Sequence, residues 1–324
     1  MKKLYLVTGA TGHLGTVLIS ELIKRGENIR ALVRAGKEGQ VQGGVEICLG
    51  DIRDKESLKS FFNLKGYDTV TLFHCAAIID ITSGNNSAVW DTNVNGTKNI
   101  MEWALNTGVN RVVYVSSVHA IPELPKPETI KEVNSFSPDD VYGQYAKSKA
   151  AAAQIVLDYA KKGLNVSIVH PSGIIGPGDV KLSNHMIRTL KDMEVGKIRI
   201  AISGGYDFVD SRDVVEGILA CETKGKPGEC YILNGHYVSV SKLLNMVRKL
   251  SGKKPIRNII PYGLVKWIAP VVEKVSILLG DKQPLFTQYS LYTLQTNANF
   301  SHRKAENELG YVPRSIKESL RDSL

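Results

Sequence analysis

Two tyrosines and two lysines lie close together in the stretch V-Y-G-Q-Y-A-K-S-K-A-A-A-A, residues 141–153. On a helix, residues four apart share a face, and Tyr145 and Lys149 have that spacing. The position four after Tyr142 is an alanine, and Lys147 lies two after Tyr145 on another face. The alanine run favours a helix at this point. The spacing therefore selects Tyr145 and Lys149 as the pair that could act together.

A free phenol has a pKa near 10 and is a poor base at neutral pH. A fixed ammonium nearby favours the phenolate, and lowering the pKa by about 3 units requires roughly 4 kcal/mol. Tyr145 could then give a proton to a carbonyl oxygen as a hydride arrives, or take it back in the reverse reaction.

A third polar group is expected at the end of the run V-V-Y-V-S-S-V-H, residues 112–119, which is typical of a buried strand. Ligands of doubly wound sheets bind at the carboxyl ends of the strands. Because side chains alternate along a strand, Ser116 and Ser117 cannot both face the crevice. One of the two serines is therefore a candidate to hold a substrate oxygen.

The glycines of T-G-A-T-G-H-L-G, residues 8–15, are spaced three apart between a predicted strand and a predicted helix. Glycines at such a turn let the backbone approach a pyrophosphate and direct the free N–H groups of the helix at it. A lone glycine pattern is weak evidence, but this one opens a βαβ unit, the context that the motif requires. The loop therefore predicts a dinucleotide site.

Two further positions bear on the dinucleotide. Arg34 ends the second predicted strand, where an acidic residue would bind the 2′-hydroxyl of NAD and an arginine suits the 2′-phosphate of NADP. The motif G-D-I-R-D follows the third strand, and Asp51 could accept a hydrogen bond from the adenine amino group with Ile52 against the ring. Asp51 could equally be an acid at a helix N-terminus.

The first half of the chain alternates short apolar runs with longer segments of helical period. This alternation predicts an α/β fold, a Rossmann-type doubly wound parallel sheet. We predict a dinucleotide-binding domain over residues 1–170 and a smaller substrate-binding lobe over 171–324 that is partly interleaved with the main sheet. The predicted strands are 4–8, 28–34, 45–49, 69–75, 111–116 and 165–170, and the predicted helices include 14–24, 55–62 and 94–106.

Composition is that of a globular protein, with 43% hydrophobic and 23% charged residues and a net charge of +9. No dense basic run with interleaved aromatics occurs, so nucleic acid is not an expected partner. The four cysteines are scattered without the short spacing of a zinc or redox motif, which favours reduced thiols, no metal site and a cytoplasmic location.

The motifs T-G-A-T-G-H-L-G, G-D-I-R-D, F-H-C-A-A, N-V-N-G-T, V-S-S and Y-A-K-S-K, in this order, resemble those of the extended short-chain dehydrogenases/reductases. That family also contains nucleotide-sugar epimerases and dehydratases. The resemblance runs nearly end to end, through P-S-G-I-I-G-P-G-D at 171–179 and F-V-D-S-R-D-V at 208–214 to L-G-Y-V-P-R-S-I-K-E-S-L at 309–320.

The resemblance implies that Tyr145 is the acid/base, that Lys149 lowers its pKa and holds the nicotinamide ribose, and that Ser117 orients the substrate oxygen. One departure is His170, where the family often has arginine, and Tyr142 is expected to be a wall residue. The remaining residues expected at the cofactor are Gly9, Thr11, Gly12, His13, Leu14, Gly15, Arg34, Asp51, Ile52, Ala76, Ala77, Asn93 and Pro171.

Within the family, Arg34 and the strand end A-L-V-R look most like the dihydroflavonol 4-reductase and 3β-hydroxysteroid dehydrogenase branches. The implied activity is hydride transfer between NADP(H) and a hydrophobic ketone, aldehyde or alcohol, with NAD(H) as the less favoured cofactor. The alternative is a nucleotide-sugar epimerase or dehydratase with tightly bound NAD. Members often pair through long helices, which leaves a homodimer open.

The segment 259–280 is unusually apolar, but its lysines, glutamate and prolines argue against a membrane span. Our first interpretation is a buried helix that lines an apolar substrate pocket. The alternative is an amphipathic segment that rests on a membrane surface.

Overall fold

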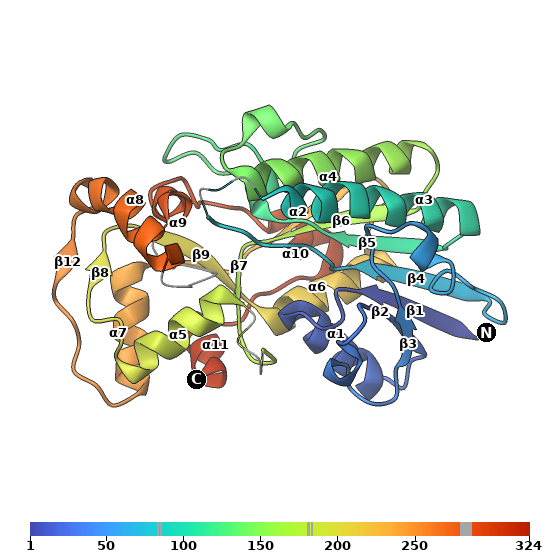
Figure 1. Cartoon of the computed structure of the whole chain (residues 1–324), viewed down its shortest axis with the longest axis horizontal. Helices are drawn as coiled ribbons and strands as arrows, with labels where there is room; N and C mark the ends of the chain where they lie inside the picture. The colour runs from blue at the N-terminus through green and yellow to red at the C-terminus, as the bar shows by residue number, and fades with distance from the viewer. Residues whose placement is uncertain (83, 85, 180–181, 183, 279–286) are drawn as a thin grey trace.

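The computed structural model describes the chain except residues 83, 85, 180–181, 183 and 279–286. Its centre is a seven-stranded sheet in the order β10-β6-β5-β4-β1-β2-β3 (Figure 1). All neighbouring strands in this sheet are parallel. The strands are β1 (Lys3–Thr8), β2 (Ile29–Val33), β3 (Glu46–Leu49), β4 (Thr69–His74), β5 (Arg111–Val115), β6 (Val166–Pro171) and β10 (Cys230–Leu233).

The inner strands are short apolar runs because both faces of the sheet are covered by helices. One core lies between the sheet and α3 and α4, and a second between the sheet and α1, α6 and α10. The predicted fold class and each predicted strand are confirmed, with end positions that differ by a residue or so. The covering helices are α1 (His13–Lys24), α3 (Thr97–Thr107), α4 (Gln144–Lys161), α6 (Ser211–Lys224) and α10 (Arg303–Leu309), with the short α2 (Ser87–Trp90) before α3.

The C-terminal half builds a smaller lobe at the carboxyl end of the main sheet (Figure 1). It also returns β10 to the edge of the main sheet beside β6. The division at residue 170 stays a prediction. The lobe holds a sheet of β7 (Gly173–Ile175), β9 (Gly205–Asp210) and β11 (His236–Ser239), a ribbon of β8 (Ala201–Ile202) and β12 (Ile259–Ile260), and the helices α5 (His185–Val195), α7 (Val240–Leu250), α8 (Tyr262–Leu278), α9 (Gln288–Thr293) and α11 (Ile316–Ser323).

One predicted helix, 55–62, is wrong: the structure has only a short 3₁₀ turn, Glu56–Leu58. The hydroxyl of Ser57 lies 3.0 Å from the carbonyl oxygen of Asp51 and 2.7 Å from that of Asp54, and it accepts from the Asp51 amide. A side chain that bonds to nearby backbone in this way competes with helical hydrogen bonding. The apolar spacing there serves to bury Leu58 and Phe61 in the core instead.

The preferred interpretation of 259–280 as a buried helix is also wrong for most of its apolar side chains. Helix α8 does form, but Leu264, Trp267, Ile268 and Val271 are exposed. Sequence pattern alone could not reveal this, because a helix with apolar residues on several faces is equally compatible with full burial. Leu279 and Gly280 lie outside the described residues.

Candidate active site

The predicted phosphate loop connects β1 to α1 by a turn too tight for side chains. Gly9 has φ +72°, and a Cβ there would lie 2.7 Å from the amide nitrogen of Ala76. A Cβ on Gly15 would lie 2.1 Å from the carbonyl oxygen of Gly9. These two glycines are therefore required by the packing of the turn on itself and on the end of β4.

Gly12 differs from the other two glycines of the loop. Its backbone is extended, with φ −85° and ψ 169°, and a Cβ would make only an ordinary contact, 3.4 Å from the carbonyl oxygen of Gly9. The fold itself thus tolerates a side chain at this position, which immediately precedes the N-terminus of α1. A bare backbone at a helix N-terminus fits a pyrophosphate group. Thr11 is half-buried at this loop, and Leu14 packs into the core.

His13 links this loop to the segment after β6. Its Nε2 lies 3.0 Å from the carbonyl oxygen of Pro177, and its Nδ1 lies 3.0 Å from the side-chain nitrogen of Asn184. The carbonyl can only accept, so Nε2 carries the proton and Nδ1 accepts from the amide. Burial lowers the pKa of His13, which favours this neutral form. The residue therefore holds Pro177 and Asn184 against the glycine turn.

The adenosine end of the predicted site lies at the ends of β2 and β3. Arg34 is exposed just beyond β2, and its charge contributes to the lowered pKa of Asp51. The larger cause is Arg53, whose guanidinium donates to both carboxylate oxygens of Asp51, at 3.0 and 2.7 Å. Ile52 is buried beneath Gly96, where a Cβ would approach its side chain to 2.6 Å.

Asn93 proves to be a bridge between elements. Its side chain exchanges hydrogen bonds with the backbone of Ile78, at 2.8 and 2.9 Å, and donates to the hydroxyl of Ser148 on α4 at 2.9 Å. It thereby fixes the loop after β4 against the helix that carries the tyrosine. In that loop, the amide of Ala76 donates to the hydroxyl of Thr8, and Ala77 is exposed.

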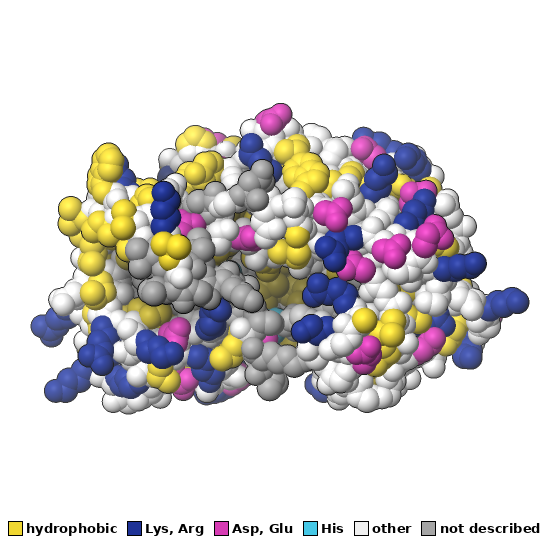
Figure 2. All heavy atoms as spheres, in the orientation of Figure 1, with side chains coloured by type: hydrophobic (Ala, Val, Ile, Leu, Met, Phe, Trp, Pro, Cys, Tyr) yellow, Lys and Arg dark blue, Asp and Glu magenta, His cyan; other side chains and the backbone are white. Residues whose placement is uncertain are grey.

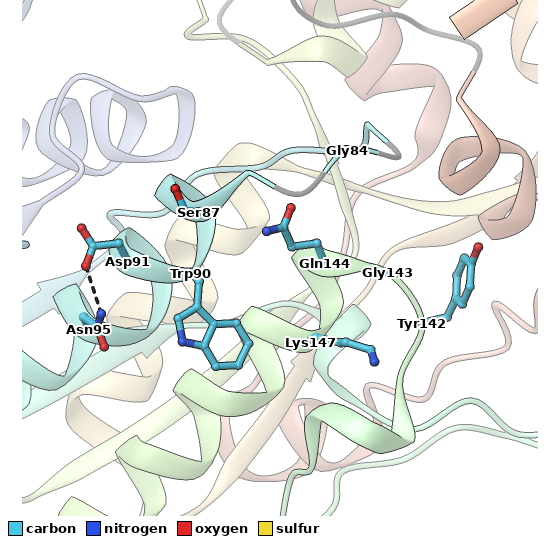
Figure 3. A pocket seen from close by; sticks show the side chains of 9 residues that line it. All are labelled: Gly84, Ser87, Trp90, Asp91, Asn95, Tyr142, Gly143, Gln144 and Lys147. Carbon is cyan, nitrogen blue, oxygen red and sulfur yellow. Dashed lines mark hydrogen bonds between the residues drawn. The ribbon is translucent and has the colours of Figure 1, made fainter. Parts of the chain in front are cut away.

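Burial separates the two tyrosines and the two lysines as the spacing predicted, although Tyr142 lies just before α4, which begins at Gln144. Tyr145 and Lys149 are buried, whereas Tyr142 and Lys147 are exposed. Figure 3 shows Tyr142 and Lys147 among the residues that line a surface cavity of about 760 Å³. They are joined there by Trp90 and by residues of the turn around α2.

Lys149 is held at the carboxyl end of β5. Its ammonium donates to the carbonyl oxygen of Val115 at 2.8 Å and to the hydroxyl of Tyr114 at 3.2 Å. Burial lowers the pKa of Lys149 to about 7. A lysine so far below its usual pKa is a candidate functional group, because structural lysines are rarely desolvated to this degree.

The predicted lowering of the tyrosine pKa requires a cationic nicotinamide beside Lys149 and stays a prediction. Burial raises the pKa of Tyr145 to about 12, and a hydrogen bond with Ser117 acts in the opposite direction. Of the two serines, Ser117 is thus the one directed at the phenol. At neutral pH Tyr145 is protonated, so the arrangement suits a proton donor.

His170, the departure from the family pattern, has a definite position. Its Nδ1 lies 3.0 Å from the backbone carbonyl oxygen of Ser117, and its ring stacks on Phe136 at 5.3 Å. Burial lowers the pKa of His170 to about 4, so the ring is neutral and Nδ1–H donates to that carbonyl. The histidine supports the serine strand end, and the buried Pro171 follows it at the end of β6.

Three aromatic residues near Tyr145 escaped the sequence interpretation. The ring of His119 lies 6.0 Å from that of Tyr145, 5.5 Å from Tyr206 and 5.7 Å from Tyr289. The Tyr206 hydroxyl and His119 Nε2 are hydrogen-bonded at 2.8 Å. His119 follows Ser117 by two residues in the quoted motif and could have been noticed there, but Tyr206 and Tyr289 are remote in sequence and carry no local signal.

The ring of Tyr289 packs closely on the backbone before α4, and its hydroxyl is buried. Its ring covers Gly143, where a Cβ would lie 2.3 Å from Cε2, and its hydroxyl is buried with no hydrogen-bond partner among the described residues. Burial raises the pKa of Tyr289 well above its usual value, and Tyr145 contributes to the increase. Buried hydroxyls in proteins are nearly always bonded, so this phenol is a candidate to bind a polar atom of a ligand.

Across the described residues, no group of three or more His, Cys, Asp or Glu side chains is placed to hold a metal ion.

The glycine turn at the carboxyl edge of a doubly wound sheet, beside a buried Ser–Tyr–Lys set, defines a nicotinamide-dinucleotide-binding enzyme.

Comparisons with known proteins agree with this class. The family model described as the NAD dependent epimerase/dehydratase family matches residues 5–234. The chain belongs to this family. A Methylococcus capsulatus protein named "Sterol demethylase protein B" is 34% identical over 98% of this chain and 96% of its own length.

Two further similarities cover nearly the whole chain. A Synechocystis sp. protein named "Putative dihydroflavonol 4-reductase" is 30% identical over 100% of this chain and 94% of its own. The crystal structure of gox2253 superposes with a TM-score of 0.84 at 31% identity, covering 99% of this chain and 96% of that one. The resemblance inferred from the motifs is thereby confirmed, and the chain is an enzyme of the extended short-chain type.

Substitutions of Gly12 and Gly15 test whether the glycine turn binds the pyrophosphate of a dinucleotide. Gly12→Ala should keep the thermal unfolding midpoint but weaken dinucleotide binding at least about tenfold, because the methyl group occupies space at the helix N-terminus. Gly15→Ala should lower the midpoint as well, since its Cβ collides with backbone. Fluorescence titration and thermal unfolding measure the two effects. Unchanged dinucleotide affinity in Gly12→Ala would place the pyrophosphate elsewhere.

Proposed function

We propose that the protein is an NADP(H)-dependent oxidoreductase that reduces a ketone or aldehyde of a hydrophobic small molecule. The observation that carries the proposal is the convergence of Ser117, Tyr145 and Lys149 in one buried volume at the carboxyl end of β5. The bound dihydronicotinamide would supply the hydride. The residues of this chain then have to hold the carbonyl oxygen and deliver one proton to it.

Ser117 and Tyr145 are suited to that task. Both hydroxyls can donate to one carbonyl oxygen, and this polarises the carbonyl carbon. As the new C–H bond forms, the π electrons of the carbonyl move to its oxygen, which takes the phenolic proton of Tyr145. The raised pKa of Tyr145 keeps that proton in place beforehand. The neighbouring ammonium of Lys149 stabilises the phenolate that is left.

Two observations support a hydrophobic substrate: the aromatic rings near Tyr145 and the names of the relatives. His119, Tyr206 and Tyr289 offer ring faces with few polar atoms, which favours an apolar or aromatic compound over a nucleotide sugar. The names of the two relatives refer to sterols and to dihydroflavonols. The alternative, a nucleotide-sugar epimerase or dehydratase, is distinguished by titrating desalted protein with NADPH and NADH. An exchangeable site that prefers NADPH supports the reductase, whereas non-dissociating NAD(H) supports the alternative.

The proton donor is tested by Tyr145→Phe. Turnover should fall at least about a hundredfold, since general acid catalysis contributes 10²–10⁴-fold, while dinucleotide affinity changes little. Steady-state kinetics with a panel of hydrophobic ketones measures the loss. Tyr159→Phe, the same change at the far end of α4, is the control and should keep wild-type turnover. Wild-type-like turnover of Tyr145→Phe would refute the mechanism.

A separate prediction concerns the buried hydroxyl of Tyr289, which has no hydrogen-bond partner among the described residues. If the Tyr289 hydroxyl bonds to a substrate oxygen, Tyr289→Phe should raise KM about three- to tenfold and change kcat less. Stability should hold or rise, by about 1 kcal/mol, because a buried hydroxyl without a partner is removed. Steady-state kinetics measures KM and kcat, and urea unfolding measures the stability. A lower stability with unchanged KM would show that the hydroxyl serves the fold.

Cofactor preference is tested at the end of β2. Arg34→Asp should weaken NADPH binding about ten- to a hundredfold, the value of a charge-assisted hydrogen bond, and should spare NADH. Arg25→Asp, another exposed arginine at the end of α1, is the matched control. Equal losses for NADPH and NADH would refute the contact between Arg34 and the 2′-phosphate.

A further inference from the structure

Helix α8 carries an exposed apolar face at the tip of the smaller lobe (Figure 1). Its large side chains Leu264, Trp267, Ile268 and Val271 are 63%, 76%, 58% and 62% exposed. Their spacing of three and four residues places them on one side of the helix. Figure 2 shows hydrophobic side chains gathered over this end of the molecule, with Lys and Arg side chains around them.

The opposite side of α8 already fulfils the packing needs of the helix. Ala269 is buried in a small cluster with Leu291 of α9 and Ile202 of β8, and Val265 packs against it. The carboxylate of Glu273 accepts from the amide of Gln288 at the start of α9. The exposed face is therefore a second apolar surface, one that the described fold does not cover. An apolar surface of this kind marks an interaction site.

The segment that carries this face is strongly basic. Residues 251–278 contain five cationic side chains and a single acid, Glu273, which is buried. The exposed cations Lys254, Arg257, Lys266 and Lys274 make no ion pair with any carboxylate in the described part of the chain. The ammonium of Lys266 lies 5.2 Å from the ring centroid of Trp267, so charge and apolar surface meet at the same place.

We propose that α8 docks the protein onto an anionic lipid surface, with Trp267 and its apolar neighbours inserted at the level of the headgroups. An exposed tryptophan and aliphatic side chains flanked by lysines are what such a surface binds. A second copy of this chain fits less well, because a two-fold contact would set the same cations against each other. Among the described helices, none is long and apolar enough to cross a bilayer.

Helix α8, which carries the docking face, packs beside a helix that contributes to the candidate site. Helix α8 packs on α9, which carries Tyr289, the unpartnered phenol. Attachment through α8 would hold the substrate lobe at the membrane surface, where apolar carbonyl compounds concentrate. Docking itself does not depend on the proposed reaction and is tested without substrate.

The test is co-sedimentation of the full chain with sucrose-loaded vesicles of phosphatidylcholine alone and of phosphatidylcholine mixed with phosphatidylglycerol. We expect binding to the mixed vesicles that weakens as salt is raised. Trp267→Ser should weaken it at least about tenfold, while Trp90→Ser, at a tryptophan 39% exposed on the other half, should not. The double variant Lys266→Glu/Lys274→Glu should lose about fivefold or more per lysine.

A matched charge control is Lys24→Glu/Lys161→Glu, which changes net charge equally at exposed positions on α1 and α4 and should keep vesicle binding. No sedimentation with either vesicle, equal loss in both double variants, or unchanged binding of Trp267→Ser would each overturn the proposal. Light scattering of the wild type and of Trp267→Ser completes the set. A dimer that Trp267→Ser converts to monomer would identify a second copy as the occupant and would also overturn it.

Discussion

The burial of Lys149 constrains everything around the candidate site. A lowering of its pKa from 10.5 to about 7 corresponds to about 5 kcal/mol against the charged form. The carbonyl of Val115 and the hydroxyl of Tyr114 offset part of the desolvation and fix the ammonium at the end of β5. A fold keeps a group this costly only where the surroundings are rigid, and both partners come from a fully buried central strand.

That rigidity is built from neutral polar groups that connect neighbouring elements. Asn93 joins the loop after β4 to α4, His13 joins the phosphate turn to the segment after β6, and His170 supports the carbonyl of Ser117. Burial keeps both histidines uncharged, so their hydrogen bonds persist across the neutral pH range. The candidate site is consequently held by contacts from several elements at once.

The smaller lobe contributes a different kind of chemistry. Toward the site it presents aromatic rings, among them Tyr289, whose hydroxyl has no hydrogen-bond partner in the described part of the chain. Away from the site, α8 presents aliphatic side chains and a tryptophan among lysines. Under the two proposals made above, the first surface would contact an apolar substrate and the second an anionic membrane surface. An enzyme whose substrate partitions into lipid gains from having both on adjoining helices, because the path from membrane to site is then short.

The sequence by itself determined the main sheet, the glycine turn and the pair Tyr145–Lys149, because each depends on local periodicity and spacing: two-sided apolar strands, three glycines at a strand-to-helix turn, and a four-residue interval on a helix. Only the tertiary structure decided the rest. The helix expected at 55–62 gave way to the hydrogen bonds of Ser57, and the pKa of Tyr145 is raised because burial outweighs the hydrogen bond with Ser117. Tyr206 and Tyr289 joined His119 from positions far along the chain, and α8 turned its apolar side outward because α9 and β8 occupied the other. Burial and long-range contact are properties of the folded chain, and no local pattern encodes them.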